Sequence, residues 1–201
     1  MSDDVAAPAV ALIELSSVAA GIVTGDAMVK ASPVASILAG TAHPGKYLVL
    51  VSGDTASVEV ALQMGLTIGG EAILDTLFLP NVAPSVVTAL RAVAEPASMI
   101  GDALGIVETA TVAASIEGAD AGVKAAHVTL EAIRLADGLG GKGYVLFTGV
   151  VAEVEVAVEA AVARTEPHGG LVAHRVVAQL HPEMADNLRS DLRFRARLGE
   201  R

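Results

Sequence analysis

Short apolar runs and longer helical stretches alternate along the chain, and their order occurs twice. In the first half, an apolar run bounded by Pro8 and Ser16 suits a buried strand better than a helix. Ser16 or Ser17 can cap the helix that follows, and Pro33 ends it. The pattern of the first half predicts strands over 10–15, 34–39, 46–52 and 73–79, and helices over 17–31 and 54–66.

The second half repeats the first. Sliding the sequence by 94 aligns residues 12–34 with 106–128 without a gap, and 11 of these 23 positions are identical. The polar identities are not explained by composition, so they indicate common descent: Glu14/Glu108, Asp26/Asp120 and Lys30/Lys124. The offset becomes 97 at Tyr47 over Tyr144, and 96 farther on. The second copy is predicted to have strands over 104–109, 128–135, 143–148 and 171–179, a first helix capped by Thr109 or Thr111, and a second helix over 151–163.

The order β-α-β-β-α-β in each copy predicts an α+β chain of two tandem ferredoxin-like domains, with both helices on one face of each sheet. Val18, Ile22 and Val29 share an apolar stripe on the first helix. The expected divisions are a first domain over 1–92, a linker over 93–102, a second domain over 103–188 and an Arg-rich tail over 189–201.

Composition narrows the functional classes. Hydrophobic residues make up 53% of the chain, mostly Ala and Val, so we expect a thin core that gains stability by oligomerisation. The absence of Cys excludes disulfides, Cys-ligated zinc and iron–sulfur clusters. A net charge of −10 argues against nucleic acid as the main partner. Neither a secretory signal nor a membrane span is apparent, so a cytoplasmic protein is expected. The basic tail is either a solvated end or a docking arm for an acidic neighbour.

The candidate chemistry points away from an enzyme. The segment 138–143 is rich in Gly and includes Lys142, but it joins two strands and lacks the Ser or Thr of a phosphate-binding loop. Neither carboxylate pair, Glu14/Glu108 or Asp26/Asp120, has a nucleophile or base arranged around it. No pair of His has the spacing of a metal site, so we expect neither metal nor cofactor; the five are His43, His127, His168, His174 and His181.

Several of these segments resemble the shell proteins of bacterial microcompartments. The match rests on Glu14, residues 26–31 (DAMVKA), residues 106–109 (IVET) and residues 123–126 (VKAA), so it covers both halves of the chain. The chain is therefore similar to the tandem-domain class, whose trimers imitate hexamers. The resemblance implies a flat tile with an axial pore, packed edge to edge with other shell proteins around encapsulated enzymes, with no membrane partner.

In that family the loop between the second and third strands lines the pore. The resemblance therefore assigns eight pore-lining residues, with Pro44 and Gly140 at the narrowest positions: Ala42, His43, Pro44, Gly45, Gly138, Leu139, Gly140 and Gly141. It also places Lys30 and Lys124 at the edge between neighbouring tiles. The alternative that the residues leave open is a tandem ferredoxin-like sensor that binds an anion or a nucleotide at the loop 138–143.

Overall fold

The computed structural model describes residues 9–91 and 101–189, which form two compact units. The first unit contains residues 9–82 and the short segment 111–113, and the second contains the remaining described residues. The expected linker over 93–102 and the tail beyond residue 189 lie largely outside the described residues. No described helix is long and apolar enough to span a membrane.

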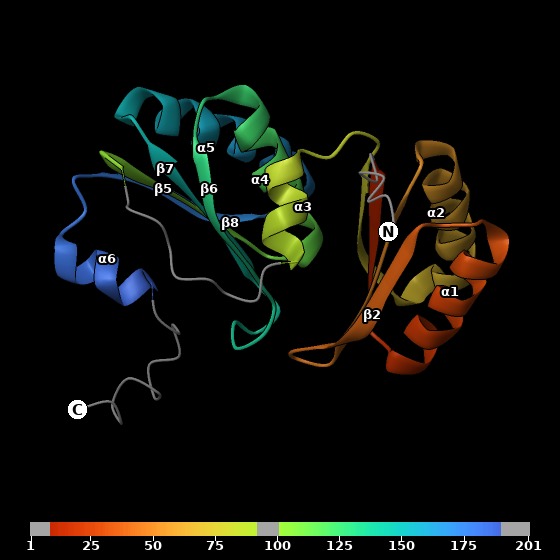
Figure 1. Ribbon diagram of the computed structural model, residues 1–201. Helices are drawn as coiled ribbons and strands as arrows, with labels where there is room; N and C mark the ends of the chain where they lie inside the picture. The colour runs from red at the N-terminus through yellow and green to blue at the C-terminus, as the bar shows by residue number, and fades with distance from the viewer. Residues whose placement is uncertain (1–8, 92–100, 190–201) are drawn as a thin grey trace. The chain divides into compact units, whose positions relative to one another are not determined.

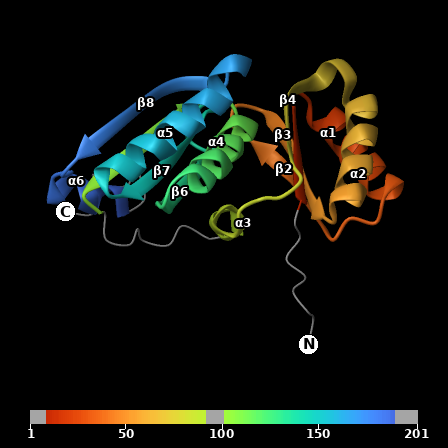
Figure 2. The same ribbon diagram turned by 90° about the horizontal axis from the view of Figure 1, so that it is seen from above.

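The first unit carries one four-stranded antiparallel sheet in the order β2-β3-β1-β4, with α1 and α2 together on one of its faces (Figures 1 and 2). This is the predicted ferredoxin-like arrangement. Its elements are β1 (Ala9–Leu15), α1 (Val18–Ala31), β2 (Ser36–Ala42), β3 (Lys46–Gly53), α2 (Thr55–Gly69), a 3-10 turn (Gly70–Ala72) and β4 (Ile73–Leu79).

The second unit repeats this sheet in the order β6-β7-β5-β8. Its elements are β5 (Ala103–Thr109), α4 (Val112–Ala125, of which residues 112 and 113 belong to the first unit), β6 (Thr129–Leu135), β7 (Gly143–Gly149), α5 (Val151–Thr165), a 3-10 turn (Glu166–His168) and β8 (Leu171–Ala178). Two short helices that the sequence pattern did not predict also lie in this unit: α3 (Pro84–Arg91) and α6 (Pro182–Arg189).

The helix α1 turns a different face to the sheet than its apolar stripe suggested. Its buried residues are Gly21, Thr24, Gly25 and Met28. The stripe residues Val18, Ile22 and Val29 are exposed in this chain. Small residues facing the sheet let the helix approach it closely, so the larger aliphatic side chains are left on the outer face.

The sheet register corrects one part of the repeat alignment. Tyr47 pairs with Leu15, whereas the residue that pairs with the equivalent Thr109 is Gly143 and not Tyr144. The offset along β3 and β7 is therefore 96 throughout. Packing between the helix and the strand agrees with this offset. In the first copy a Cβ on Gly21 of the helix would lie 2.3 Å from the Tyr47 ring on the strand. The equivalent residues of the second copy are Ser115 on the helix and Gly143 on the strand. Each copy thus combines one small residue with one larger residue, in opposite positions.

Asp54 caps α2, and this cap predicts a measurable pH effect. Its Oδ1 accepts the backbone N–H of Ser57 at 2.9 Å. Hydrogen bonds from Ser57 lower the pKa of Asp54 below its ordinary value of 3.8. Because the folded pKa lies below the unfolded one, the charge stabilises the fold above the unfolded pKa, and this contribution is lost as pH falls through the folded value.

Asp54→Asn keeps a capping oxygen but removes the titration. Wild type is therefore expected to lose more stability than the variant between about pH 6 and about pH 3. Urea unfolding at the two pH values checks this, and equal losses for the two proteins would show that the cap does not depend on charge.

Candidate functional site

The loops between the second and third strands of each copy are framed by the same two residue types. In the first copy, Ala42 ends β2 and pairs with Lys46 at the start of β3. In the second copy, the N–H of Ala136 donates to the carbonyl of Lys142 at 2.9 Å. Between these frames lie three residues in the first loop, 43–45, and five in the second, 137–141. The two loops are therefore equivalent in position and differ in length and content.

Each framing lysine reaches back to the carboxylate on the first strand of its own copy. Lys46 Nζ lies 3.0 Å from Glu14 Oε2, and both side chains are largely buried. Lys142 contacts Glu108 in the same way, but this pair is much more exposed. The ion pair connects the base of each loop to the centre of its sheet, because β1 and β5 are inner strands.

The sequence alignment missed these framing lysines. Aligning Tyr47 with Tyr144 placed Lys46 opposite Gly143, so the shared lysine was not apparent. The available signal was that each loop is followed directly by a lysine, and the sheet register is needed to recognise the two as equivalent.

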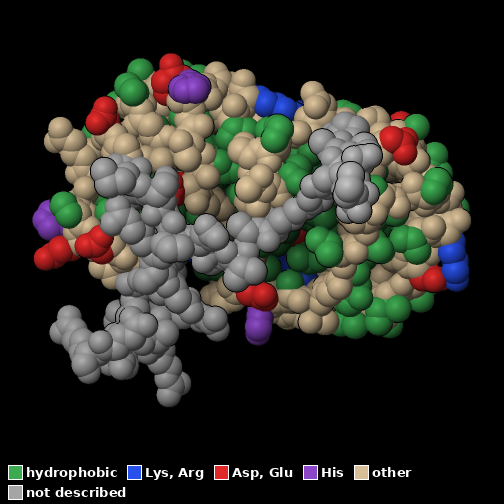
Figure 3. Space-filling model, viewed as in Figure 1, with side chains coloured by type: hydrophobic (Ala, Val, Ile, Leu, Met, Phe, Trp, Pro, Cys, Tyr) green, Lys and Arg blue, Asp and Glu red, His purple; other side chains and the backbone are tan. Residues whose placement is uncertain are grey.

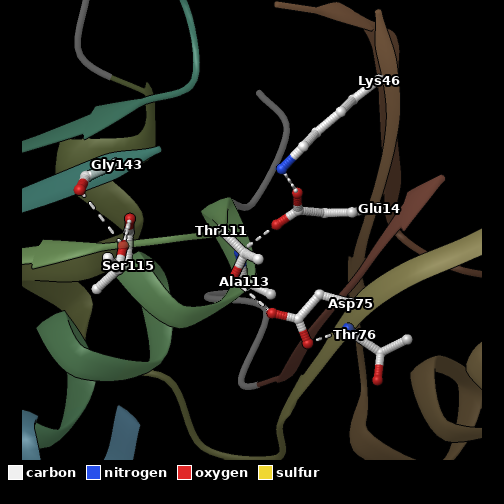
Figure 4. Close-up of polar contacts among 9 residues, drawn as sticks. Glu14, Lys46, Asp75, Thr76, Thr111, Ala113, Ser115 and Gly143 are labelled. Atoms are coloured by element: carbon white, nitrogen blue, oxygen red, sulfur yellow. Dashed lines mark hydrogen bonds and ion pairs between the residues drawn. The ribbon is translucent and has the colours of Figure 1, made fainter. Parts of the chain in front are cut away.

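Glu14 has a second role inside the first unit. Its other oxygen, Oε1, accepts the backbone N–H of Ala113 at 2.7 Å (Figure 4). Nearby, Asp75 accepts a hydrogen bond from the hydroxyl of Thr111 (Figure 4). Both acceptors belong to strands of the first sheet, and both donors belong to the segment 111–113, which is part of the same unit. These carboxylates hold a segment of backbone, which is a structural use.

The structure divides the eight predicted loop residues by exposure. Ala42 and Gly141 are buried, and Leu139 is half-buried. The exposed members are His43, Pro44, Gly45, Gly138 and Gly140. A Cβ added to Gly45, Gly138 or Gly140 would meet no atom within 4 Å, so side chains there would extend into open space. All three glycines have positive φ, a conformation that disfavours other residues.

The predicted edge lysines lie on helices and pair with the carboxylate one turn before them. Lys30 is bound to Asp26 and Lys124 to Asp120, each at 2.5 Å. Lys30 is the more exposed of the two. Among the described residues, no group of three His, Asp or Glu side chains could hold a metal ion. The carboxylates described in this section thus bind lysines or backbone N–H and hydroxyl groups.

Comparison with known proteins agrees with this architecture. The BMC domain family matches residues 9–82 and 103–180. The bacterial microcompartment shell protein PduT of Citrobacter freundii is 38% identical over 176 residues, which are 88% of this chain and 95% of PduT. The carboxysome shell protein CsoS1C of Halothiobacillus neapolitanus is 39% identical over 93 residues, which are 46% of this chain and 93% of that protein.

A solved structure gives the same answer for the fold. The crystal structure of a microcompartment protein from Desulfitobacterium hafniense DCB superposes with a TM-score of 0.78 at 40% identity, covering 90% of this chain and 99% of that one. Both halves of the chain are thus BMC domains, each with the sheet order and helix placement described above. The chain therefore belongs to the bacterial microcompartment shell proteins, in the class that carries two BMC domains in tandem.

Proposed function

We propose that three copies of this chain form a pseudohexameric tile with a central pore for small metabolites. Three chains supply six equivalent domains, and cyclic closure leaves no unpartnered edge inside such a ring. The observation that carries the proposal is the pair of loops framed by Ala and Lys at equivalent sheet positions. Around a threefold axis these loops would alternate, one containing His43 and Pro44 and the other built mostly of glycine.

The proposed role is structural and not catalytic. The tile would join other shell proteins edge to edge in the cytoplasm, with Lys30 and Lys124 at the tile edge and encapsulated enzymes on one side. The division into domains over 1–92 and 103–188, a linker over 93–102 and a tail over 189–201 belongs to this proposal. Support comes from the exposed lysine positions and from the two BMC domains.

Native mass measurement tests the assembly. The expected result is a species of three times 20.2 kDa that forms sheets under electron microscopy. A stable monomer would overturn the proposal. Thermal unfolding with added nucleotides provides the opposite test, since strong stabilisation by a ligand would favour the sensor hypothesis instead.

A bulky residue at Gly140 is expected to reduce metabolite flux through assembled shells, because its side chain would enter the opening. Gly140 has a φ of 65°, so Gly140→Phe also adds backbone strain of about 1–3 kcal/mol. Gly70→Phe is the matched control, since Gly70 has a φ of 48° and open space around its Cβ but lies outside the loops. Flux measured across shells made with each variant should fall only for Gly140→Phe. Equal flux for the two variants would contradict the assignment of this loop to the pore.

A further inference from the structure

The helices α3 and α6 are counterparts that follow the last strand of each copy. Leu79 pairs with Val10 in the first sheet, and Val177 pairs with the equivalent Leu104 in the second. The same offset of 98 aligns Pro84 with Pro182, the first residues of the two helices. Both helices also end in Leu-Arg, at residues 90–91 and 188–189.

The helix α3 packs on β6 within the second unit, and the residue just before it is bound by Asp120 of α4; this surface of β6 and α4 is called the seat of α3. Val86 of α3 is completely buried. The backbone N–H of Ala83, just before the helix, donates to Asp120 Oδ1 at 2.8 Å. Asp120 Oδ2 meanwhile binds Lys124. The seat therefore combines an apolar contact at Val86 with a carboxylate, Asp120, that accepts a backbone hydrogen bond from the residue before the helix.

The helix α6 leaves the counterparts of Val86 and Ala83 exposed. Met184, the counterpart of Val86, is 51% exposed. His181, the counterpart of Ala83, is exposed as well. Ala185 is buried, so the open part of the apolar side of α6 lies at Met184, the position that is buried in α3.

The first copy carries an equivalent seat that is open. Asp26 Oδ2 binds Lys30 as Asp120 Oδ2 binds Lys124, but the Asp26 side chain is 57% exposed and that of Asp120 only 6%. Ile22 is 56% exposed, whereas its counterpart Ile116 is fully buried. Exposed Ile37 of β2, whose Cδ1 would lie 3.7 Å from a Cβ on Gly25 of α1, extends the apolar surface, and hydrophobic side chains gather over β2 and α1 in the space-filling view (Figure 3).

We propose that α6 of one chain docks on α1 and β2 of a second copy of this chain, as α3 docks on α4 and β6 within one chain. Met184 would pack on the apolar surface of β2, and Asp26 Oδ1 would accept the backbone N–H of His181. The inference deepens the proposed trimer, on which it rests for ring closure. The contact itself is head-to-tail, since the end of one chain meets the beginning of the next.

A second contact within the chain also has counterparts that would meet between neighbouring chains. Glu14 accepts the N–H of Ala113 at the start of α4. The counterparts are Glu108 in the second copy and Ala19, an exposed residue at the start of α1. Docking would bring the carboxylate of Glu108 to the first turn of α1 in the neighbouring chain. The Asp75 contact is not repeated, because the residue that pairs with Glu108 at its position is Ala173.

Cysteine cross-linking tests the contact directly, since the chain has no Cys of its own. The variant Asp26→Cys/His181→Cys, treated with a short bismaleimide, should yield covalent dimers and trimers on a denaturing gel. Each single variant alone should stay monomeric, and a mixture of the two singles should give dimers only. Ala83→Cys/Asp120→Cys is the matched control, because its two sites meet within one chain and its product should run as a monomer.

The outcomes separate this inference from the trimer. Native trimers that do not cross-link between residues 26 and 181 would overturn the docking and leave the trimer standing. Cross-linked ladders extending beyond three chains would support the docking and overturn the closed ring. A stable monomer without interchain products would overturn both.

A charged residue in the docking face gives an independent readout. Met184→Glu should abolish the native trimer while far-UV circular dichroism stays that of wild type, because Met184 is exposed in the single chain. Val86→Glu, at the counterpart position, should instead lower the unfolding temperature, because Val86 is buried in the subunit. A trimer that persists in Met184→Glu would contradict the docking.

Discussion

Replacing Gly122 by methionine is expected to unfold the second unit, or to destabilise it by at least the ~3 kcal/mol at the upper end of usual overpacking costs. A Cβ at Gly122 would lie 2.3 Å from Cζ of Phe147. Phe147 is fully buried on β7 and cannot move away without disturbing the core. Urea unfolding followed by circular dichroism measures the loss.

The first copy suggests how the damage can be repaired. At the positions equivalent to Gly122 and Phe147 it has Met28 and Val51, both fully buried in one core cluster. Gly122→Met/Phe147→Val should therefore recover most of the stability that Gly122→Met loses. In a double-mutant cycle the two changes should couple favourably, by about 0.5–3 kcal/mol or more. Additive losses would show that the two copies do not pack these positions alike.

Much of the fold could be predicted because its signals are local. Ser17 and Asp54 cap the helices that the sequence places after them, and each predicted strand is found within a few residues of its expected bounds. The stripe Val18, Ile22 and Val29 is exposed in this chain, which the sequence could not show, since periodicity identifies a face and not what covers it. Burial of the same face on α4 depends on contacts distant in sequence.

The short helices and the loop frames were missed for related reasons. The helices α3 and α6 are eight residues each, too short for a periodic pattern to stand out, although Pro84 and Pro182 are typical first residues of helices. The equivalence of Lys46 and Lys142 appears only when strand pairing fixes the register. Matching tyrosines gave an attractive alignment that the core packing contradicts.

Glu14→Ala is expected to be the most destabilising single change among the polar residues, costing about 3–5 kcal/mol, as when one partner of a buried ion pair is removed. Glu14 is fully buried, and its two oxygens serve Lys46 and the N–H of Ala113. The substitution takes both contacts away and leaves a cavity on the central strand β1. The loop 43–45, which ends just before Lys46, would lose its connection to the sheet at the same time.

Two comparisons make this prediction sharp. Glu14→Gln keeps an acceptor for Ala113 but removes the charge opposite Lys46, so its stability should lie between that of wild type and that of Glu14→Ala. Arg164→Ala breaks a more exposed pair, Arg164 with Glu117, and should cost at most about 1 kcal/mol. The measurement is the urea midpoint of unfolding of wild type and the three variants, all at the same protein concentration. If Glu14→Ala unfolded at the same urea concentration as Arg164→Ala, the carboxylate would not hold the loop base and the segment 111–113 to the sheet, and the common framing of the two loops would need another cause.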